Sequence, residues 1–217
     1  ANTTVAFPGG DWGTFLGADV GTVEYFYSTT ISVNNSAMTL PADINTYYNL
    51  RIDNTNNTSS RRIWTNTQKM TIYNDIVLED NTVLDENQGE FYLRCDLDVG
   101  NDFRVEGGTR VVVINNGTHT FEIGGDFNIA SNYGRYTMSG NAIHNLYLSG
   151  NMVTNGFNNF DDSDARSTRI TFQGNSNVSW TGATAGVTGN EITQVGQVVI
   201  NFDDTTTVLS INDPKFD

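Results

Sequence analysis

Residues 97–105, LDVGNDFRV, decide the fold, because related segments return along the chain at nearly constant spacing. Close copies are FEIGGDFNI at 121–129, LYLSGNMVT at 146–154 and ITFQGNSNV at 170–178. Weaker copies begin at Ile31, Leu50, Met70 and Ile200. The chain therefore contains about eight repeats with a period near 24 residues, and such self-similarity is typical of solenoids.

Each repeat opens with two apolar residues separated by one position, which places both side chains on one face of a strand. A pair of Asn, Gly or Asp residues follows, and these types tolerate a left-handed backbone or hydrogen-bond to nearby backbone. An apolar residue then often returns, as at Phe103 and Phe127. We interpret the polar pairs as structural corners: Asn74, Asp75, Asn101, Asp102, Gly125, Asp126, Gly150, Asn151, Gly174 and Asn175.

Short strands joined by corners every 24 residues predict an all-β fold, a parallel β-helix (β-solenoid) of about eight coils. The alternative is an antiparallel β-sandwich, which also shows short strands with frequent turns but has no reason to repeat a corner at constant phase. We expect residues 1–30 to form an atypical first coil or cap, and residues 31–217 to form the repeats. Coils would start near 31, 50, 70, 97, 121, 146, 170 and 200, in a piece of a much longer chain.

The chain is acidic, with a formal net charge of −14 and apolar residues making up 37% of 217. Phosphate backbones would repel such a chain, so nucleic acid is not an expected partner. The sequence contains no run of 18 apolar residues, so it predicts no membrane-spanning helix. The single cysteine, Cys95, lies in a strand-like segment, which favours a role in core packing.

The sequence contains little that predicts catalysis. Its two histidines, His119 and His144, accompany no recognisable nucleophile motif, so we expect no catalytic residues. Adjacent carboxylates occur at Asp161-Asp162 and Asp203-Asp204, but adjacent acids are weak evidence in a chain with 25 of them. Solvated loops explain both pairs.

No cofactor is expected, and calcium is the one metal that the sequence suggests. Asp161, Asp162 and Asp164 form an acidic loop with the hard oxygen ligands that Ca²⁺ prefers. The corner acids Asp75, Asp102 and Asp126 would stack on consecutive coils and are a second calcium candidate. Aromatic residues that could stack on sugar rings are Tyr47, Tyr48, Tyr133, Tyr136 and Trp180, although we expect half or more of them to pack in or beside the core.

The segments MTIYNDIVLEDNTVL at 70–84 and LDVGNDFRVEGG at 97–108, with YNLRI at 48–52 and HNLYL at 144–148, carry a resemblance. This stretch resembles repeat regions of giant cell-surface adhesins of Bacteroidota, including gliding-motility adhesins. The similarity extends over about residues 20–212. It implies a secreted, cell-surface location and export through the type IX secretion machinery as a partner.

Together these features predict a non-enzymatic rod segment of a large extracellular surface protein or filament, which supports adhesion or gliding. Surface polysaccharide or other surfaces are the expected partners. The alternative is a polysaccharide-binding or polysaccharide-cleaving β-helix, which would need acidic and basic side chains on adjacent coils beside an aromatic groove. A third hypothesis is a phage or virus fibre segment, which should form trimers.

Overall fold

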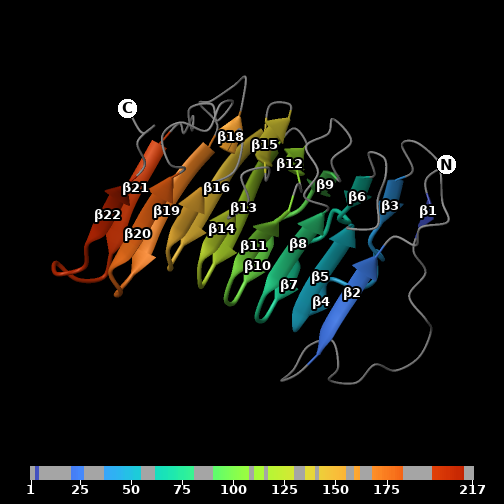
Figure 1. The fold of residues 1–217 in the computed structure, drawn as a ribbon, viewed down its shortest axis with the longest axis horizontal. Helices are drawn as coiled ribbons and strands as arrows, with labels where there is room; N and C mark the ends of the chain where they lie inside the picture. The colour runs from blue at the N-terminus through green and yellow to red at the C-terminus, as the bar shows by residue number, and fades with distance from the viewer. Residues whose placement is uncertain are drawn as a thin grey trace.

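The computed structural model describes residues 3–4, 21–26, 37–54, 62–80, 90–107, 110–114, 117–129, 135–139, 142–154, 159–161, 168–182 and 197–212. These residues form short β-strands and no helix. The strands stack into an elongated body that runs from β1 and β2 at one end to β21 and β22 at the other (Figure 1).

Three sheets extend along this body, with seven, seven and eight strands. Sheet A contains β1 (Thr3–Thr4), β3 (Ala37–Thr39), β6 (Arg62–Trp64), β9 (Glu90–Leu93), β12 (Arg110–Ile114), β15 (Arg135–Ser139) and β18 (Asn159–Asp161). Sheet C contains β4 (Thr46–Tyr47), β7 (Met70–Ile72), β10 (Leu97–Val99), β13 (Gly117–Ile123), β16 (Ala142–Leu148), β19 (Thr168–Gly174) and β21 (Gln197–Phe202). Sheet B contains β2 (Thr22–Phe26), β5 (Asn49–Asn54), β8 (Ile76–Asp80), β11 (Phe103–Glu106), β14 (Phe127–Ile129), β17 (Met152–Thr154), β20 (Val178–Gly182) and β22 (Leu209–Asn212).

Consecutive strands belong to different sheets, and the pairing between coils is parallel. The chain passes from β10 in sheet C to β11 in sheet B and β12 in sheet A, and then returns to sheet C at β13. β10 pairs in parallel with both β7 and β13, its counterparts in the preceding and following coils. The predicted parallel β-solenoid is therefore confirmed, and the antiparallel sandwich is wrong.

The clearest repeats are in register. Leu97 pairs with Met70 on one side and with Phe121 on the other, and the same column continues through Leu146 to Ile170. All five side chains are fully buried. The first apolar position of the repeat is therefore an inward column of sheet C.

Two of the predicted coil starts do not belong to this column, so the expected set of eight equivalent starts is wrong. Leu50 lies in β5 of sheet B and pairs with Ile76, because an apolar-x-apolar pair beside Asn also occurs in the second strand of a coil. Ile200 pairs with Phe172 instead of Ile170. A two-residue shift keeps the same face inward, so the alternation could not reveal it. Ile31 lies outside the described residues.

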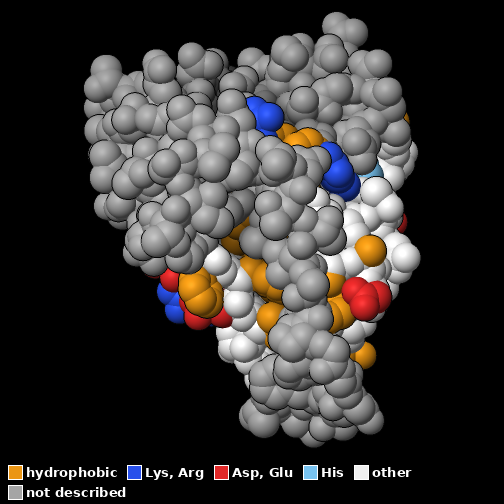
Figure 2. All heavy atoms as spheres, turned by 90° about the vertical axis from the view of Figure 1, so that its right-hand side faces the viewer, with side chains coloured by type: hydrophobic (Ala, Val, Ile, Leu, Met, Phe, Trp, Pro, Cys, Tyr) orange, Lys and Arg blue, Asp and Glu red, His pale blue; other side chains and the backbone are white. Residues whose placement is uncertain are grey.

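Within residues 1–30 the structure describes two strands. β1 is the edge strand of sheet A, and β2 pairs with β5 in register from Thr22↔Asn49 to Phe26↔Asp53. β2 follows the alternation of an ordinary sheet B strand, with Val23 and Tyr25 buried. On the outer face of sheet B, Arg51 forms ion pairs with Glu24 and Glu79. Acidic and basic side chains also lie side by side on the surface at this end of the molecule (Figure 2).

The core is a set of apolar columns enclosed by the three sheets. The rings of Phe103 and Phe127, on consecutive coils of sheet B, stack with centroids 5.1 Å apart. Cys95 is buried, and its burial raises the pKa of the thiol. The expectation that this cysteine packs in the core is confirmed. Each coil places apolar side chains at equivalent positions, so the columns form one core that extends along the rod.

Candidate functional site

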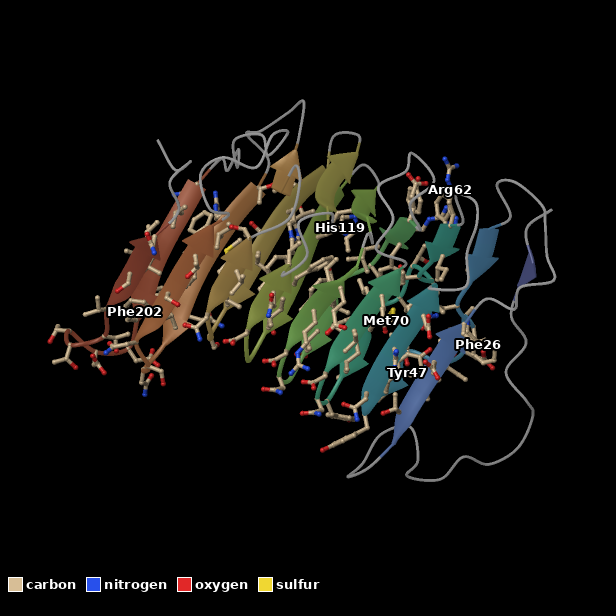
Figure 3. The ribbon with its side chains drawn as sticks, in the orientation of Figure 1. Phe26, Tyr47, Arg62, Met70, His119 and Phe202 are labelled. Atoms are coloured by element: carbon tan, nitrogen blue, oxygen red, sulfur yellow. The ribbon has the colours of Figure 1, made fainter. Side chains whose placement is uncertain are left out.

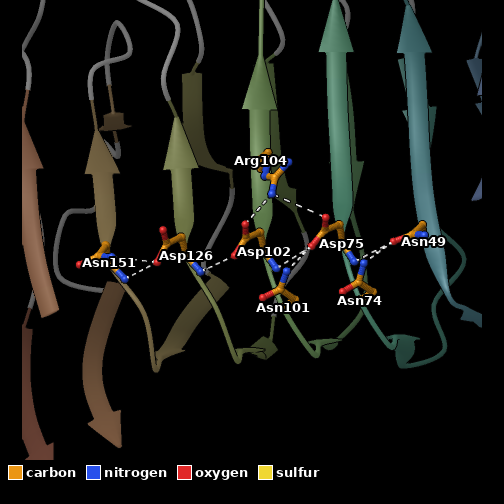
Figure 4. A network of polar contacts seen from close by, with 8 residues as sticks. All are labelled: Asn49, Asn74, Asp75, Asn101, Asp102, Arg104, Asp126 and Asn151. Atoms are coloured by element: carbon orange, nitrogen blue, oxygen red, sulfur yellow. Dashed lines mark hydrogen bonds and ion pairs between the residues drawn. The ribbon is translucent and has the colours of Figure 1, made fainter. Parts of the chain in front are cut away.

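The most regular polar feature is a line of side chains at the corner between sheets C and B, which we call the corner ladder (Figure 4). Its members are Asn49, Asp75, Asp102, Asp126 and Asn151. Each Oδ1 atom accepts a hydrogen bond from the backbone N–H of the next coil. The distances are 3.2 Å from Asp75, 3.2 Å from Asp102, 2.8 Å from Asp126, 2.7 Å from Asn151 and 2.9 Å from Ser179.

The asparagines beside this ladder strengthen it. Asn74 Nδ2 donates to Asn49 Oδ1 at 2.8 Å, and Asn101 Nδ2 donates to Asp75 Oδ1 at 2.7 Å. A carboxylate that accepts N–H groups from the following coil links two coils through their side chains as well as their backbones. The ladder therefore links each corner to the next one along the rod. In every link the acceptor lies in the preceding coil and the donor in the following coil.

Arg104 balances part of the negative charge that the ladder brings together. Its Nη2 atom lies 2.6 Å from Asp102 Oδ2 and 3.6 Å from Asp75 Oδ2. The hydrogen bond to Asp102 raises the pKa of the Arg104 guanidinium. The stacked acids Asp75 and Asp102 are thus held by amides and by an arginine, so hydrogen bonding and this ion pair account for their position without a metal.

Glycines occupy corner positions where the backbones of consecutive coils approach closely. A Cβ atom built on Gly124 would lie 2.3 Å from the carbonyl oxygen of Gly100, and one on Gly150 would lie 2.3 Å from the carbonyl oxygen of Gly125. None of these residues has a positive φ, whereas Gly174 has φ +97°. Crowding by the neighbouring backbone, and not a left-handed conformation, requires glycine at positions 124 and 150.

The predicted corner at Gly174 and Asn175 departs from the ladder. Asn151 Oδ1 accepts from both the backbone N–H and the hydroxyl of Ser179, and Asn175 is exposed. The register pairs Met152 with Trp180, so this corner is longer than its predecessors. Asn177 takes a ladder role in the following coil, where its Oδ1 accepts from Val208 N at 2.9 Å.

The calcium candidates fall largely outside the described structure. Asp161 ends β18, and only its backbone is described; Asp162 and Asp164 lie outside the described residues. Across the described ranges, no group of three or more His, Cys, Asp or Glu side chains is arranged to hold a metal ion. The calcium hypothesis for the acidic loop stays a prediction.

The other acidic pair lies in an exposed turn. Asp204 Oδ1 accepts from the backbone N–H groups of Thr206 and Thr207 at 2.7 and 2.8 Å, and from both hydroxyls. These hydrogen bonds, those from Thr206 first, lower the pKa of Asp204. The carboxylate therefore caps its own turn.

Both histidines lie within the wall of the solenoid instead of an open site. His119 pairs in register with His144, and His144 pairs with Thr168, all on sheet C (Figure 3 labels His119). The three residues are buried, and the ring of Phe121 contacts His144 edge-on at 4.4 Å. Burial, with the charge of His119 as a smaller cause, lowers the pKa of His144 to about 3.

The lowered pKa of His144 predicts that the folded protein loses stability in acid. The unfolded chain binds a proton at His144 below its ordinary pKa of 6.5, whereas the folded chain does not until about 3. The free energy of unfolding should therefore fall as the pH drops below 6.5, by about 1.4 kcal/mol per pH unit from this group. Urea unfolding between pH 7 and pH 5 measures the slope. The variant His144→Phe should flatten it, and an unchanged slope in that variant would contradict the assignment.

The aromatic residues singled out in the sequence mostly serve the core. Tyr47 and Trp180 are fully buried, and Trp180 Nε1 donates to Thr154 Oγ1 at 3.0 Å. These two rings therefore belong to the part of the set that was expected to pack in the core, and they are not available to sugars. Tyr48 is half-buried, Tyr133 lies outside the described residues, and the side chain of Tyr136 is not described.

A different aromatic group lies on the outer face of sheet A, and we call it the sheet A cluster. Its members are Arg62, Trp64, Glu90, Tyr92 and Arg94, all partly exposed. Trp64 and Tyr92 stack with centroids 4.4 Å apart, and the Arg94 guanidinium lies 3.3 Å from the Trp64 ring centroid. Arg62 and Tyr92 both hydrogen-bond to Glu90 Oε2, at 2.8 and 2.7 Å. In Figure 3, Arg62 lies at the top of the body, toward its right-hand end.

Sequence reasoning missed this cluster, although a signal was present. Arg62-Ile63-Trp64 and Tyr92-Leu93-Arg94 alternate large outward side chains with buried aliphatic ones, which is typical of strands with one solvent-facing side. The two segments lie 28 residues apart and meet only through the register that pairs Trp64 with Tyr92.

Comparison with protein-family models, with curated proteins and with solved structures finds no match for this chain. In the part of the chain that the structure describes, no helix is long and apolar enough to span a membrane. The fold therefore defines the class to which the chain belongs: it is a parallel β-solenoid with three sheets and a corner ladder.

Proposed function

We propose that the chain is a non-enzymatic structural or adhesive rod segment of a large extracellular bacterial surface protein. The observation that carries this proposal is the corner ladder, in which carboxylates and amides are committed to joining successive coils. A catalytic groove needs acidic and basic groups directed at a substrate. Here the acids of the ladder accept backbone N–H groups instead.

The continuous sheets support the same function. Seven or eight strands in each sheet run side by side along the body, so backbone hydrogen bonds lie parallel to its long axis. Such a body supplies length and stiffness, since each coil contacts only its neighbours and covers their core. The loops that leave the coils would then supply the contacts with other surfaces.

The resemblance to repeat regions of Bacteroidota adhesins supports a cell-surface location and export through the type IX secretion machinery. It also supports a role in adhesion or gliding. These proposals rest on the short segments around Tyr48 and His144 and on their spacing.

Surface labelling and an in-frame deletion test the proposal. In the organism that encodes the chain, antibodies against residues 31–217 should label intact cells. Deletion of these residues should reduce attachment or gliding several-fold. In the control strain, an unrelated solenoid of similar length replaces residues 31–217. If labelling requires permeabilised cells, or if deletion leaves attachment and gliding unchanged, the proposal is wrong.

The second candidate function, polysaccharide binding, is favoured by the sheet A cluster. Partly exposed Trp64 and Tyr92 provide aromatic surface for sugar rings, and Arg62 and Arg94 provide charge for acidic sugars. Among the residues that the structure describes, Trp64 Nε1 and Arg94 Nε are buried donors that find no hydrogen-bond acceptor. A bound saccharide could supply acceptor oxygens after small movements of these side chains.

This candidate predicts a specific loss of binding. If the sheet A cluster binds acidic polysaccharide, Trp64→Ala should weaken binding at least about tenfold, because stacking on an aromatic ring and its neighbouring arginine is lost. Calorimetry or affinity electrophoresis with uronate-containing polysaccharides measures the change. Tyr73→Ala, at an aromatic residue 53% exposed on another corner, is the matched control. Equal affinity of the wild type and Trp64→Ala would contradict this role.

A further inference from the structure

Among the residues that the structure describes, Arg94 of the sheet A cluster holds a guanidinium without an anionic partner. Arg51, Arg62 and Arg104 all form ion pairs with carboxylates, whereas no described carboxylate pairs with Arg94. Asp96, two positions further along, instead accepts a backbone N–H of the following coil at 2.9 Å. Burial lowers the pKa of the Arg94 guanidinium. A partly buried cation without a counter-charge is a position where an anion from outside the chain is stabilised.

Contacts with the preceding coil hold this guanidinium in place. It lies 3.3 Å from the centroid of the Trp64 ring. The backbone N–H of Arg94 donates to Thr65 Oγ1 at 2.9 Å, and Thr65 is fully buried. A planar guanidinium held against an aromatic ring presents paired N–H donors, which match the two oxygens of a carboxylate.

The aromatic surface beside Arg94 runs along the rod. Trp64 and Tyr92 belong to consecutive coils, and their rings stack with an interplanar angle of 10°. Together they form an apolar strip across two coils. An apolar strip beside a cation suits a ligand that carries both ring surface and negative charge, which is the chemistry of an acidic sugar.

The basic residues of sheet A continue beyond this pair of coils. One register column crosses β6, β9, β12 and β15, which follow one another along the upper side of the body in Figure 1. Its members are Arg62, Glu90, Arg110 and Arg135.

This part of sheet A is richer in basic residues than its neighbour. The four strands contain three arginines and one acidic residue, whereas the described strands of sheet B contain two arginines and five acidic residues. The segments that lead into the four strands, 55–61, 81–89, 107–109 and 130–134, add Arg61, Asp85 and Glu86. Basic residues therefore still outnumber acidic ones there, in a chain of net charge −14. Such a local excess attracts a linear polyanion.

We propose that sheet A binds an acidic polysaccharide lengthwise, with Arg94 pairing with a sugar carboxylate and the arginine column extending the contact toward β15. Consecutive coils are about 4.8 Å apart, close to the length that one sugar unit adds to an extended polysaccharide, so successive units meet successive coils. This inference rests on the polysaccharide-binding function proposed above. It adds the orientation of the ligand and the residue that selects its charge.

Calorimetry with the complete 217-residue chain and uronate oligosaccharides tests this inference. The wild type should bind a hexasaccharide at least about tenfold more tightly than a disaccharide, because the longer chain reaches more arginines. Arg94→Gln should weaken binding of the hexasaccharide at least about tenfold, since a charge-assisted pair is lost. The methyl-esterified hexasaccharide, which carries no charge, should bind the wild type and Arg94→Gln equally weakly.

Arg169→Gln is the matched control, because it removes an exposed arginine from β19 of sheet C and should keep the wild-type affinity. Circular dichroism should show that both variants are folded, and the comparisons of length and esterification need only the wild type. A wild type that binds no acidic polysaccharide would overturn both the polysaccharide-binding function and this inference. Binding of the hexasaccharide with an unchanged affinity in Arg94→Gln would overturn the inference alone. Equal affinity of the wild type for the disaccharide, for the esterified hexasaccharide or for polyglutamate would do the same.

Discussion

Replacing Gly124 with alanine is expected to destabilise the protein by about 3 kcal/mol, or to prevent folding. The added Cβ atom would lie 2.3 Å from the carbonyl oxygen of Gly100, and 3.0 Å from its carbonyl carbon. Both atoms are backbone, so no side-chain rotation can relieve the overlap. Two coils must then separate at the corner, which also strains the neighbouring ladder. Urea or thermal unfolding measures the loss.

The control for this variant lies in the next coil. Ser149 donates its N–H to Ile123 O, as Gly124 does to Val99 O, so the two residues occupy equivalent corners. Ser149 already carries a Cβ atom, and Ser149→Ala should change the free energy of unfolding by less than about 0.5 kcal/mol. Equal stability of Gly124→Ala and the wild type would show that the coils do not approach as described.

The second large effect is expected from Asp102→Ala, at the centre of the corner ladder. Its carboxylate accepts from Asp126 N at 2.8 Å and pairs with Arg104 at 2.6 Å, and its side chain is 19% exposed. Removing it leaves a poorly solvated N–H group without its acceptor and Arg104 without its shorter ion pair. The expected loss is about 2 to 3 kcal/mol in the free energy of unfolding.

Two further variants distinguish the effect of losing the hydrogen bond from the effect of losing a negative charge. Asp102→Asn keeps an oxygen that can accept from Asp126 N, so it should lose only about 1 kcal/mol. Asp98→Ala removes an outward carboxylate that pairs with Lys69 and is 39% exposed, so it should lose less than about 0.5 kcal/mol. If all three variants lose the same stability, the ladder contributes nothing specific.

The fold could be predicted from the sequence because each coil repeats the same pattern, an inward apolar pair followed by a polar corner. Leu97, Phe121 and Leu146 recur at a spacing that only stacked coils explain, and their register is the one that the repeats indicate. The corner acids Asp75, Asp102 and Asp126 were found by the same reasoning. Their partners were not, since an Oδ1 atom that accepts from the next coil is a contact across 24 to 27 residues.

What sequence reasoning missed depends on distances between coils. Nothing in the local pattern around Gly150 shows that a carbonyl oxygen approaches it, so its tolerance of a left-handed backbone was taken as the reason for glycine. Leu50 and Ile200 were misplaced because strands of sheets B and C share the same alternation. The stacking of Trp64 on Tyr92 requires the register of sheet A, which the nine-residue repeat does not include.

Cysteine cross-linking tests the central claim, the parallel stacking of consecutive coils, most directly. Asn128 and Val153 are register partners on the outer face of sheet B, and Thr181 occupies the same column one coil further on. In a Cys95→Ala background, Asn128→Cys with Val153→Cys should form an intramolecular disulfide on mild oxidation. Asn128→Cys with Thr181→Cys should not, because two strand spacings, about 9.6 Å, exceed the reach of a disulfide. Failure of the first pair, or equal cross-linking of both pairs, would contradict the solenoid.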